Sequence, residues 1–279
     1  MPRYDLGRRR SGRVRRTDAP LCCSVFPVRS CVPCKTIIHT VATWLAVIFA
    51  AATGRCRGEH ADADTISSMC SLDITHWRVI VPVKGQLSAK TRLYPPPGVA
   101  RADLAHALAL DTLTAVLSCV TPDHLIVVTS DELTATFVRD QGATVVLDLG
   151  NGLNPAVAQG IEYVQRVLGP GPTAVLLGDI PTLRPEDLAG ALSQCSMHPR
   201  AFVPDASGTG TVLISALSRH DLQPKFGAHS AREHGRTHIR LDLDIPALRT
   251  DVDDDEALRQ ALAIGVGRHT AAALHQARG

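Results

Sequence analysis

From Trp77 to the C-terminus, short β-rich runs of the chain alternate with longer amphipathic stretches. This alternation is typical of βαβ units around a mostly parallel sheet. The expected strands are Arg78–Val83, Leu125–Thr129, Thr144–Asp148, Ala174–Leu177, Ala201–Val203 and Thr211–Ile214. The expected helices are Ala100–Cys119, Pro155–Val167, Pro185–Ser193, Asp255–Ile264 and His269–Ala277. With about 200 residues, this part can bury one sizeable core, so we expect a single α/β domain.

The distribution of charge separates this part from the segment before it. Residues 1–58 hold eleven of the 29 Lys and Arg residues but only two of the 27 Asp and Glu residues. Six of the eight cysteines also lie within the first 70 residues. The remainder is acidic and poor in cysteine, as expected of a reduced, cytoplasmic enzyme.

The N-terminal segment gives no clear signal of its own. Its apolar run, Ile37–Ala52, is shorter than the roughly 20 residues that a membrane span needs. Cys31 and Cys34 lack a second Cys or His pair at zinc-finger spacing, so a solvated or disordered extension is preferred. Another hypothesis is that translation begins at Met69. We therefore expect residues 1–68 to be an extension and residues 69–279 to be the catalytic domain; a membrane-tethered role remains an alternative.

A carboxylate follows the fourth expected strand. The run from Thr173 to Leu183 contains four aliphatic residues and then reaches Asp179. In open α/β sheets ligands bind beyond the carboxyl ends of the strands, and an oxygen ligand there suits Mg²⁺ held against a phosphate. The same residues, Gly-Asp-Ile-Pro, also suit a plain turn.

Basic residues follow the first expected strand in the same way. Lys84, Lys90 and Arg92 lie in and after one loop at the strand's carboxyl end. Such cations can bind the phosphates of a nucleotide. The loop lacks the G-x-x-x-x-G-K-[ST] pattern of a P-loop, and a solvated basic loop is the alternative.

Two loops of small residues come later in the chain. The stretch Pro204–Leu213 alternates Gly with Thr, which can form an anion-binding nest or simply a hairpin turn. The stretch Lys225–His234 contains Gly227 and Ser230 before a short helical segment that could hold a second phosphate. His229 and His234 could be ligands, but lone histidines are more often surface or capping residues, which is the interpretation preferred here.

An acidic segment precedes the last helices. Asp251 and Asp253 alternate, so in an extended chain they share one face and could complete a Mg²⁺ site with Asp179. Asp255 and Glu256 are expected to cap, or lie in the first turn of, the helix that follows.

Six stretches occur in a characteristic order: VPVK…AKTRL, GLNPAVAQG, LLGDIPTL, PDASGTGTVL, FGAHS and TDVDD. Together they resemble the phosphoenolpyruvate / 2-phospho-L-lactate guanylyltransferase family of coenzyme F-420 biosynthesis. The resemblance runs from about Trp77 to the C-terminus. It implies a single-domain nucleotidyltransferase fold, a three-layer sandwich around a mixed, mostly parallel sheet. It also implies transfer of GMP from GTP to the phospho-acid, with release of pyrophosphate.

The resemblance assigns roles to particular residues. Thr211, Gly227 and Ser230 fall where the family binds the phospho-acid, and Asp179, Asp251 and Asp253 fall where it holds Mg²⁺. The mechanism adds the cations that the loop itself suggested: Lys84, Lys90 and Arg92 would stabilise the triphosphate and the leaving pyrophosphate, so these three and Asp179 are the expected catalytic residues. Two positions depart from the family pattern: Ala206-Ser207 stands where a basic residue is common, and Ala228-His229 stands where the family varies.

The implied partners are GTP and a small phosphorylated acid, with handover of an unstable product to the next enzyme of the pathway. Neither nucleic acid nor a membrane is expected as a partner. The alternatives are a molybdenum-cofactor-type nucleotidyltransferase, whose Gly-rich first loop is missing here, and a GTP-binding regulator without catalysis. The sequence leaves open the acceptor, whether phosphoenolpyruvate, 2-phospholactate or 3-phosphoglycerate, and the oligomeric state.

Overall fold

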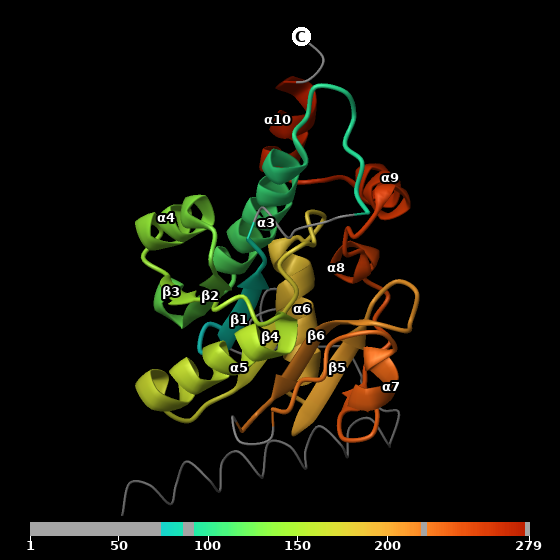
Figure 1. The fold of residues 1–279 in the computed structure, drawn as a ribbon. Helices are drawn as coiled ribbons and strands as arrows, with labels where there is room; N and C mark the ends of the chain where they lie inside the picture. Colours follow the sequence, from blue (N-terminus) through green and yellow to red (C-terminus); the bar gives the residue numbers. More distant parts are fainter. Residues whose placement is uncertain (1–73, 86–91, 219–221, 277–279) are drawn as a thin grey trace, which may run out of the picture. The chain divides into compact units, whose positions relative to one another are not determined.

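A computed structural model describes residues 74–85, 92–218 and 222–276 (Figure 1). The chain divides into two units, and every element described below belongs to the second, Ala63–Gly279. Lys90, the apolar run Ile37–Ala52 and the Cys31–Cys34 pair lie outside the described residues. The predicted boundary after residue 68 therefore stays a prediction.

The described part of the chain forms one seven-stranded mixed sheet. Its order is β3-β2-β1-β4-β6-β5-β7. The strands are β1 (Arg78–Val83), β2 (Leu125–Thr129), β3 (Thr144–Leu147), β4 (Thr173–Leu176), β5 (Arg200–Pro204), β6 (Thr211–Ala216) and β7 (Ile239–Arg240). The first four strands run parallel, whereas β6 runs antiparallel to both of its neighbours, β4 and β5. The predicted mixed, mostly parallel sheet is confirmed.

Helices cover both faces of this sheet (Figure 1). They are α3 (Arg101–Leu117), α4 (Glu132–Asp140), α5 (Leu153–Tyr163), α6 (Pro185–Cys195), α7 (Ser230–His234), α8 (Pro246–Arg249), α9 (Asp255–Ile264) and α10 (Arg268–Gln276). A 3-10 turn, Pro122–His124, precedes β2, and a π-helical turn, Val164–Leu168, follows α5. The fold is therefore the three-layer sandwich expected from the sequence.

The alternation of side chains along the strands explains the layers, because neighbouring residues of a strand point to opposite faces. Val79 and Val81 of β1 pack in one buried cluster with Leu113 of α3 and Leu188 of α6. Ile80, between them, belongs to a second cluster that includes residues of α5 and α7. A strand with partners on both faces reads as a continuous apolar run, which is why β1 and β2 have the predicted bounds.

The C-terminal helices are attached to α3 through a buried carboxylate. Asp111 accepts hydrogen bonds from the backbone N–H groups of His269 and Thr270, both at 2.9 Å, in the first turn of α10. Asp254 caps α9 by accepting from Ala257 N at 3.0 Å. The predicted cap was placed one residue too late, and Asp255 and Glu256 lie in the first turn of α9.

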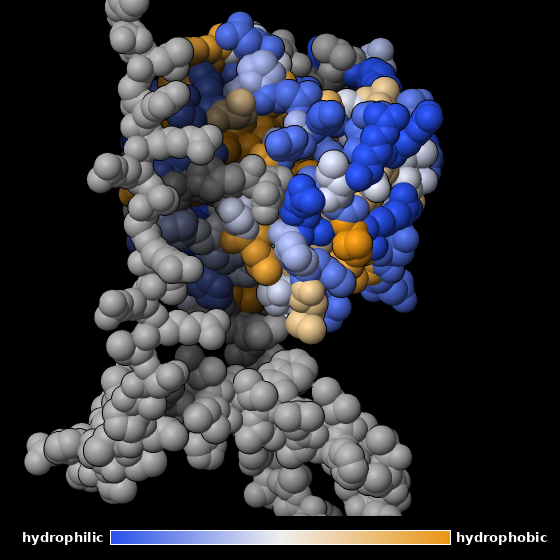
Figure 2. Space-filling model, turned by 90° about the horizontal axis from the view of Figure 1, so that it is seen from below, coloured by the Kyte–Doolittle hydropathy of each residue, from blue (hydrophilic) through white to orange (hydrophobic). Residues whose placement is uncertain are grey.

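Within the described ranges, no helix combines the length and apolar character needed to cross a membrane. One face of the molecule is drawn in Figure 2, where the described surface is mainly hydrophilic and hydrophobic side chains lie in small groups.

Candidate active site

The ends of several strands meet at one edge of the sheet. Because β1 to β4 are parallel, their carboxyl ends lie on the same side. β6 runs the other way, so its first residue, Thr211, lies at this edge as well. A hydrogen bond of 3.0 Å from Leu177 N to Val212 O continues the pairing of β4 with β6 up to this point.

A cavity of about 140 Å³ opens at this edge. Its polar side chains come from three separate segments: Lys84 after β1, Asp179 after β4, and Asp251 and Asp253 between α8 and α9. Ala105 and Ala109 of α3, together with Leu153 and Leu177, supply apolar lining. One carboxylate oxygen of Asp179 is buried. The structure thus brings together the three acids that the sequence predicted as neighbours, with a lysine on the same wall.

Hydrogen bonds from two directions fix the backbone around Asp179. The carbonyl of Asp179 accepts from Val252 N at 3.0 Å, and the next amide, Ile180 N, donates to the Thr112 hydroxyl of α3 at 2.9 Å. Gly178 packs directly on β1, since a Cβ there would lie 2.7 Å from the Pro82 carbonyl oxygen. The carboxylate is therefore carried on a backbone with little freedom to shift.

A second cavity, of about 230 Å³, shares Lys84 and Leu153 with the first. Ser130 follows β2 and Asp148 follows β3, and both side chains line it, with Gly150 and Gly152 nearby. Neither Ser130 nor Asp148 was predicted as a site residue. Ser130 follows the fully buried β2, so the rule that singled out Asp179, a polar residue just after a buried strand, would have found it. Asp148 was expected inside its strand, and β3 is only partly buried.

The predicted cations have different positions. Lys84 lines both cavities. Arg92 is exposed and lines none of the cavities described here, and Lys90 lies outside the described residues. In residues 74–85, 92–218 and 222–276, no three His, Cys, Asp or Glu side chains form a complete metal site by themselves.

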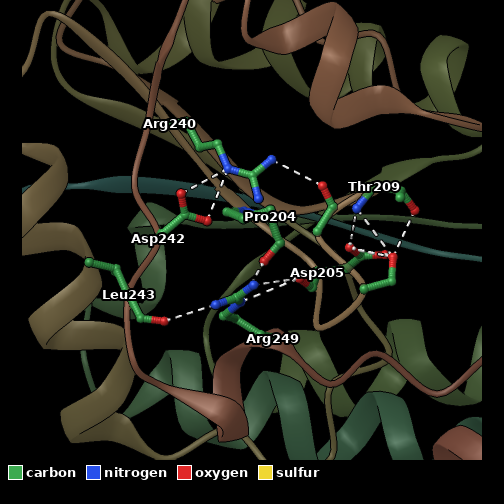
Figure 3. A network of polar contacts seen from close by, with 9 residues as sticks. Pro204, Asp205, Thr209, Arg240, Asp242, Leu243 and Arg249 are labelled. Carbon is green, nitrogen blue, oxygen red and sulfur yellow. Dashed lines mark hydrogen bonds and ion pairs between the residues drawn. The ribbon is translucent and has the colours of Figure 1, made fainter.

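The loop between β5 and β6 is a hairpin connection organised by Asp205 (Figure 3). The Asp205 carboxylate accepts from Thr209 N at 3.0 Å and from the Ser207 hydroxyl. The guanidinium of Arg249 donates to the carbonyls of Asp205, at 2.9 Å, and of Pro204 and Leu243, both at 3.2 Å. The N–H of Thr209 is thus already bound to Asp205, which supports the hairpin interpretation of this loop over an anion nest.

Thr211, Gly227 and Ser230 lie near one another around the start of α7. Ser230 N donates to the Gly227 carbonyl at 3.1 Å, and the next amide, Ala231 N, donates to the Thr209 carbonyl at 3.1 Å. Gly227 has a φ of 142°, which favours glycine. None of the three lines the cavity that contains Asp179. The three residues that were predicted to bind the phospho-acid thus form a group of their own, outside the cavity that contains Asp179.

His234 corrects the sequence interpretation, which treated the histidines of this stretch as surface or capping residues. His229 is indeed exposed, but His234 is 1% exposed. Its ring lies 2.8 Å from the Thr211 hydroxyl at Nδ1 and accepts from Lys225 N at Nε2, also at 2.8 Å. Burial, followed by the charges of His238 and Lys225, lowers the pKa of His234 to about 4. The ring is therefore neutral at physiological pH.

The two cysteines of the described part are not activated thiols. Burial raises the pKa of Cys119 and of Cys195 to about 11, so both stay protonated near neutral pH. Neither lines either of the two cavities at the sheet edge. Neither thiol is therefore positioned or ionised to act as a nucleophile in these cavities.

Comparison with known proteins places this site in a family. Residues 100–248 match the family model of the MobA-like NTP transferase domain. A phosphoenolpyruvate guanylyltransferase of Streptomyces coelicolor is 42% identical over 201 residues, which cover 70% of this chain and 94% of the relative. One from Geodermatophilus obscurus is 45% identical over 206 residues, covering 71% and 94%. The crystal structure of Rv0371c from Mycobacterium tuberculosis is 19% identical, with a TM-score of 0.46, and covers 68% of this chain and 98% of its own. Since relatives this similar match along nearly their whole length, the chain belongs to the phosphoenolpyruvate guanylyltransferase family.

Proposed function

We propose that this protein transfers GMP from GTP to phosphoenolpyruvate and releases pyrophosphate. The observation that carries the proposal is the cavity at the carboxyl edge of β1 and β4, where Lys84 faces the same space as Asp179, Asp251 and Asp253. A lysine and clustered carboxylates at such an edge suit the binding of phosphates and of the cation that accompanies them. Relatives that cover most of the chain bear the name of this activity.

The chemistry needs positioning more than activation. The acceptor is already a phosphate anion near neutral pH, so its attack on the α-phosphate of GTP requires no general base. The obstacle is the approach of one anion to another. Lys84 would offset the charge of the triphosphate and of the leaving pyrophosphate, while the rigid backbone around Asp179 keeps the reacting groups in line. Ala105 and Ala109 would restrict water on the side of α3.

The acids of the cavity fit Mg²⁺. Asp179, Asp251 and Asp253 offer only oxygen ligands, and Mg²⁺ is commonly held by one or two carboxylates together with substrate phosphates. When bound, the ion would neutralise charge that develops on the phosphates.

The two cavities suggest a division of the substrates. We assign the nucleoside part of GTP to the cavity lined by Ser130, Asp148 and the glycine-containing segment at Gly150 and Gly152, because it shares Lys84 with the acidic cavity. The phospho-acid would approach from the side of Thr211, Gly227 and Ser230. The role of Lys90 and Arg92 at the triphosphate stays a prediction from the sequence.

The proposal also fixes a context. The reaction would take place in the cytoplasm as a step of coenzyme F-420 biosynthesis, with residues 69–279 as the catalytic domain. Its product joins an enol phosphate to GMP through a phosphoanhydride, and such a product would be handed to the next enzyme before it hydrolyses.

The test is release of pyrophosphate by the full chain with GTP and Mg²⁺. Phosphoenolpyruvate, 2-phospholactate and 3-phosphoglycerate are offered separately, and ATP serves as the nucleotide control. Release with GTP and phosphoenolpyruvate supports the proposal. Release of pyrophosphate only with another acid would show that this acid, and not phosphoenolpyruvate, is the acceptor. GTP binding without pyrophosphate release in any mixture would favour a GTP-binding regulator without catalysis.

A further inference from the structure

The segment between β6 and α7 is held in place by side chains from two other parts of the fold. The side-chain amide of Asn154 in α5 makes two hydrogen bonds with the backbone of Phe226. Its Nδ2 donates to the Phe226 carbonyl and its Oδ1 accepts from Phe226 N, both at 2.8 Å. The preceding amide, Lys225 N, donates to Nε2 of His234 at 2.8 Å. Two consecutive residues thus bind to two different anchors.

The His234 ring joins this segment to β6. A backbone N–H can only donate, so Nε2 of His234 must be the bare acceptor, and the proton of the neutral ring is on Nδ1. That Nδ1–H then donates to the Thr211 hydroxyl, 2.8 Å away. As a consequence, Thr211 keeps its own hydroxyl proton for another acceptor.

Packing leaves this ring little room to move. His234 and Thr211 are 1% and 3% exposed. The rings of Phe202 and Phe226 lie 5.9 Å and 5.4 Å from the imidazole, centroid to centroid. Asn154 in turn follows Leu153, which lines both cavities of the sheet edge. The two anchors therefore connect the wall of the site with the loop that contains Gly227 and with the start of β6.

We propose that Asn154 and His234 are positioning residues that hold the segment Lys225–Ser230 against Thr211 and thereby determine how tightly the acceptor binds. The inference rests on the proposed function, in which the small phosphorylated acid approaches from the side of Thr211, Gly227 and Ser230. It assigns no contact with GTP to either anchor. Their loss should therefore weaken binding of the acid and leave binding of the nucleotide unchanged.

Two substitutions at His234 separate its two hydrogen bonds. His234→Gln can place an acceptor near Lys225 N, whereas His234→Asn can place a donor near Thr211. Asn154→Leu removes both contacts with Phe226 at similar size. His275→Gln is the control, because His275 is an exposed histidine in the last turn of α10 and lies outside the segment Lys225–Ser230.

The experiment measures kcat and KM of the full chain for GTP and for phosphoenolpyruvate. We expect Asn154→Leu and His234→Asn to raise KM for phosphoenolpyruvate about tenfold or more, the scale of a lost buried hydrogen bond, with KM for GTP within about twofold of wild type. His234→Gln should recover part of the loss, and His275→Gln should match wild type. Unchanged KM for the acid, equal increases for both substrates, or an equally impaired His275→Gln would overturn the proposal.

Hydrogen exchange supplies a readout that does not depend on turnover. In the wild-type chain the amides of Lys225 and Phe226 should exchange slowly, and Asn154→Leu should release Phe226. Fast exchange of both amides in the wild type would refute the anchoring itself. If the wild type instead shows slow exchange but no turnover with phosphoenolpyruvate, the proposed function fails while the anchoring stands. Unfolded variants would be recognised by fast exchange throughout β1 and β4.

Discussion

The amide of Val252 donates a hydrogen bond of 3.0 Å to the carbonyl of Asp179. Val252 is fully buried, and its neighbours, Asp251 and Asp253, both line the cavity that contains the Asp179 side chain. Alternation along an extended segment explains this pattern, since residues two apart point the same way. The single backbone bond therefore aligns two acidic segments that are more than seventy residues apart in the sequence.

Removal of the Asp179 charge tests the role of this acid. Asp179→Asn keeps the shape of the side chain but weakens its interaction with a cation, so kcat for pyrophosphate release should fall at least about 100-fold, a typical loss for an electrostatic group of an active site. Steady-state kinetics at saturating Mg²⁺ provides the measurement. Asp140→Asn, at the exposed end of α4, is the control and should leave kcat unchanged. Near-normal turnover of Asp179→Asn would exclude the proposed role.

The close packing of Gly178, just after β4, against β1 leads to a second prediction. Gly178→Ala would place a Cβ 2.7 Å from the Pro82 carbonyl oxygen and 2.9 Å from Cγ2 of Val83. We expect the free energy of unfolding to fall by about 1–3 kcal/mol, as in other overpacked sites, and turnover to fall with it. Gly190→Ala, on the exposed side of α6 with no atom within 4 Å, should be neutral or stabilising. Urea unfolding of both variants distinguishes the two sites, and equal effects would contradict the packing argument.

The buried ring of His234 predicts a dependence of stability on pH. The pKa of His234 is about 4 in the folded chain against an ordinary value of 6.5, so between these values the unfolded chain binds more protons. The stabilising contribution is complete above pH 6.5 and is lost as the pH falls toward 4. The slope is at most about 1.4 kcal/mol per pH unit, the limit for one proton.

Denaturant unfolding of wild type and His234→Gln between pH 7.5 and 4.5 measures this effect. The wild type should lose more stability than the variant across the window, because Gln does not titrate. The groups that face the ring, His238 and Lys225, remain in both chains. If the unfolding free energies of the two chains change with pH in parallel, His234 does not contribute to the pH dependence of stability.

Replacement of arginine by lysine should destabilise the fold at Arg249 much more than at an exposed arginine. Its planar guanidinium donates to three carbonyls in different directions, as Figure 3 shows, and the single ammonium of a lysine cannot reach all of them. Arg249→Lys should lower the free energy of unfolding by about 1–3 kcal/mol. Arg259→Lys, in an exposed ion pair with Glu256, should change it by less than about 0.5 kcal/mol. Thermal unfolding of the two variants makes the comparison, and similar Tm values would refute the distinction.

Local patterns predicted the elements with a strong signature of their own. β1, β2 and α9 have the predicted bounds, because a buried apolar run or a regular amphipathic stretch defines each of them. α4 was missed: it is short and mostly polar, and its one clear signal is Asp131, whose carboxylate accepts from Thr134 N at 2.9 Å. The grouping of Asp179 with Asp251 and Asp253 was predicted as a Mg²⁺ site; the three acids line one cavity, and their role as metal ligands stays a prediction.

Contacts between distant segments were beyond such patterns. The reversed direction of β6 depends on pairing with β4 across the whole of α6 and β5. The buried position of His234 depends on a hydrogen bond from the backbone of Lys225, nine residues earlier in the chain. The role of Asn154 depends on its contact with Phe226, 72 residues away. No local pattern specifies these partners, so polar residues of this kind resemble ordinary surface residues in a single sequence.

The reversal of strand direction between β4 and β6 also separates the proposed site residues into two blocks along the sequence. Residues 78–179 supply Lys84, Asp148 and Asp179, whereas Thr211, Gly227 and Ser230 all lie within residues 200–240. If the first block binds the nucleotide and the second the acid, the two specificities are modular and can diverge separately in evolution. In that case a chimaera joined in the turn after α6, at residues 196–199, and after β7 should take its acceptor specificity from the second block and retain GTP as the donor.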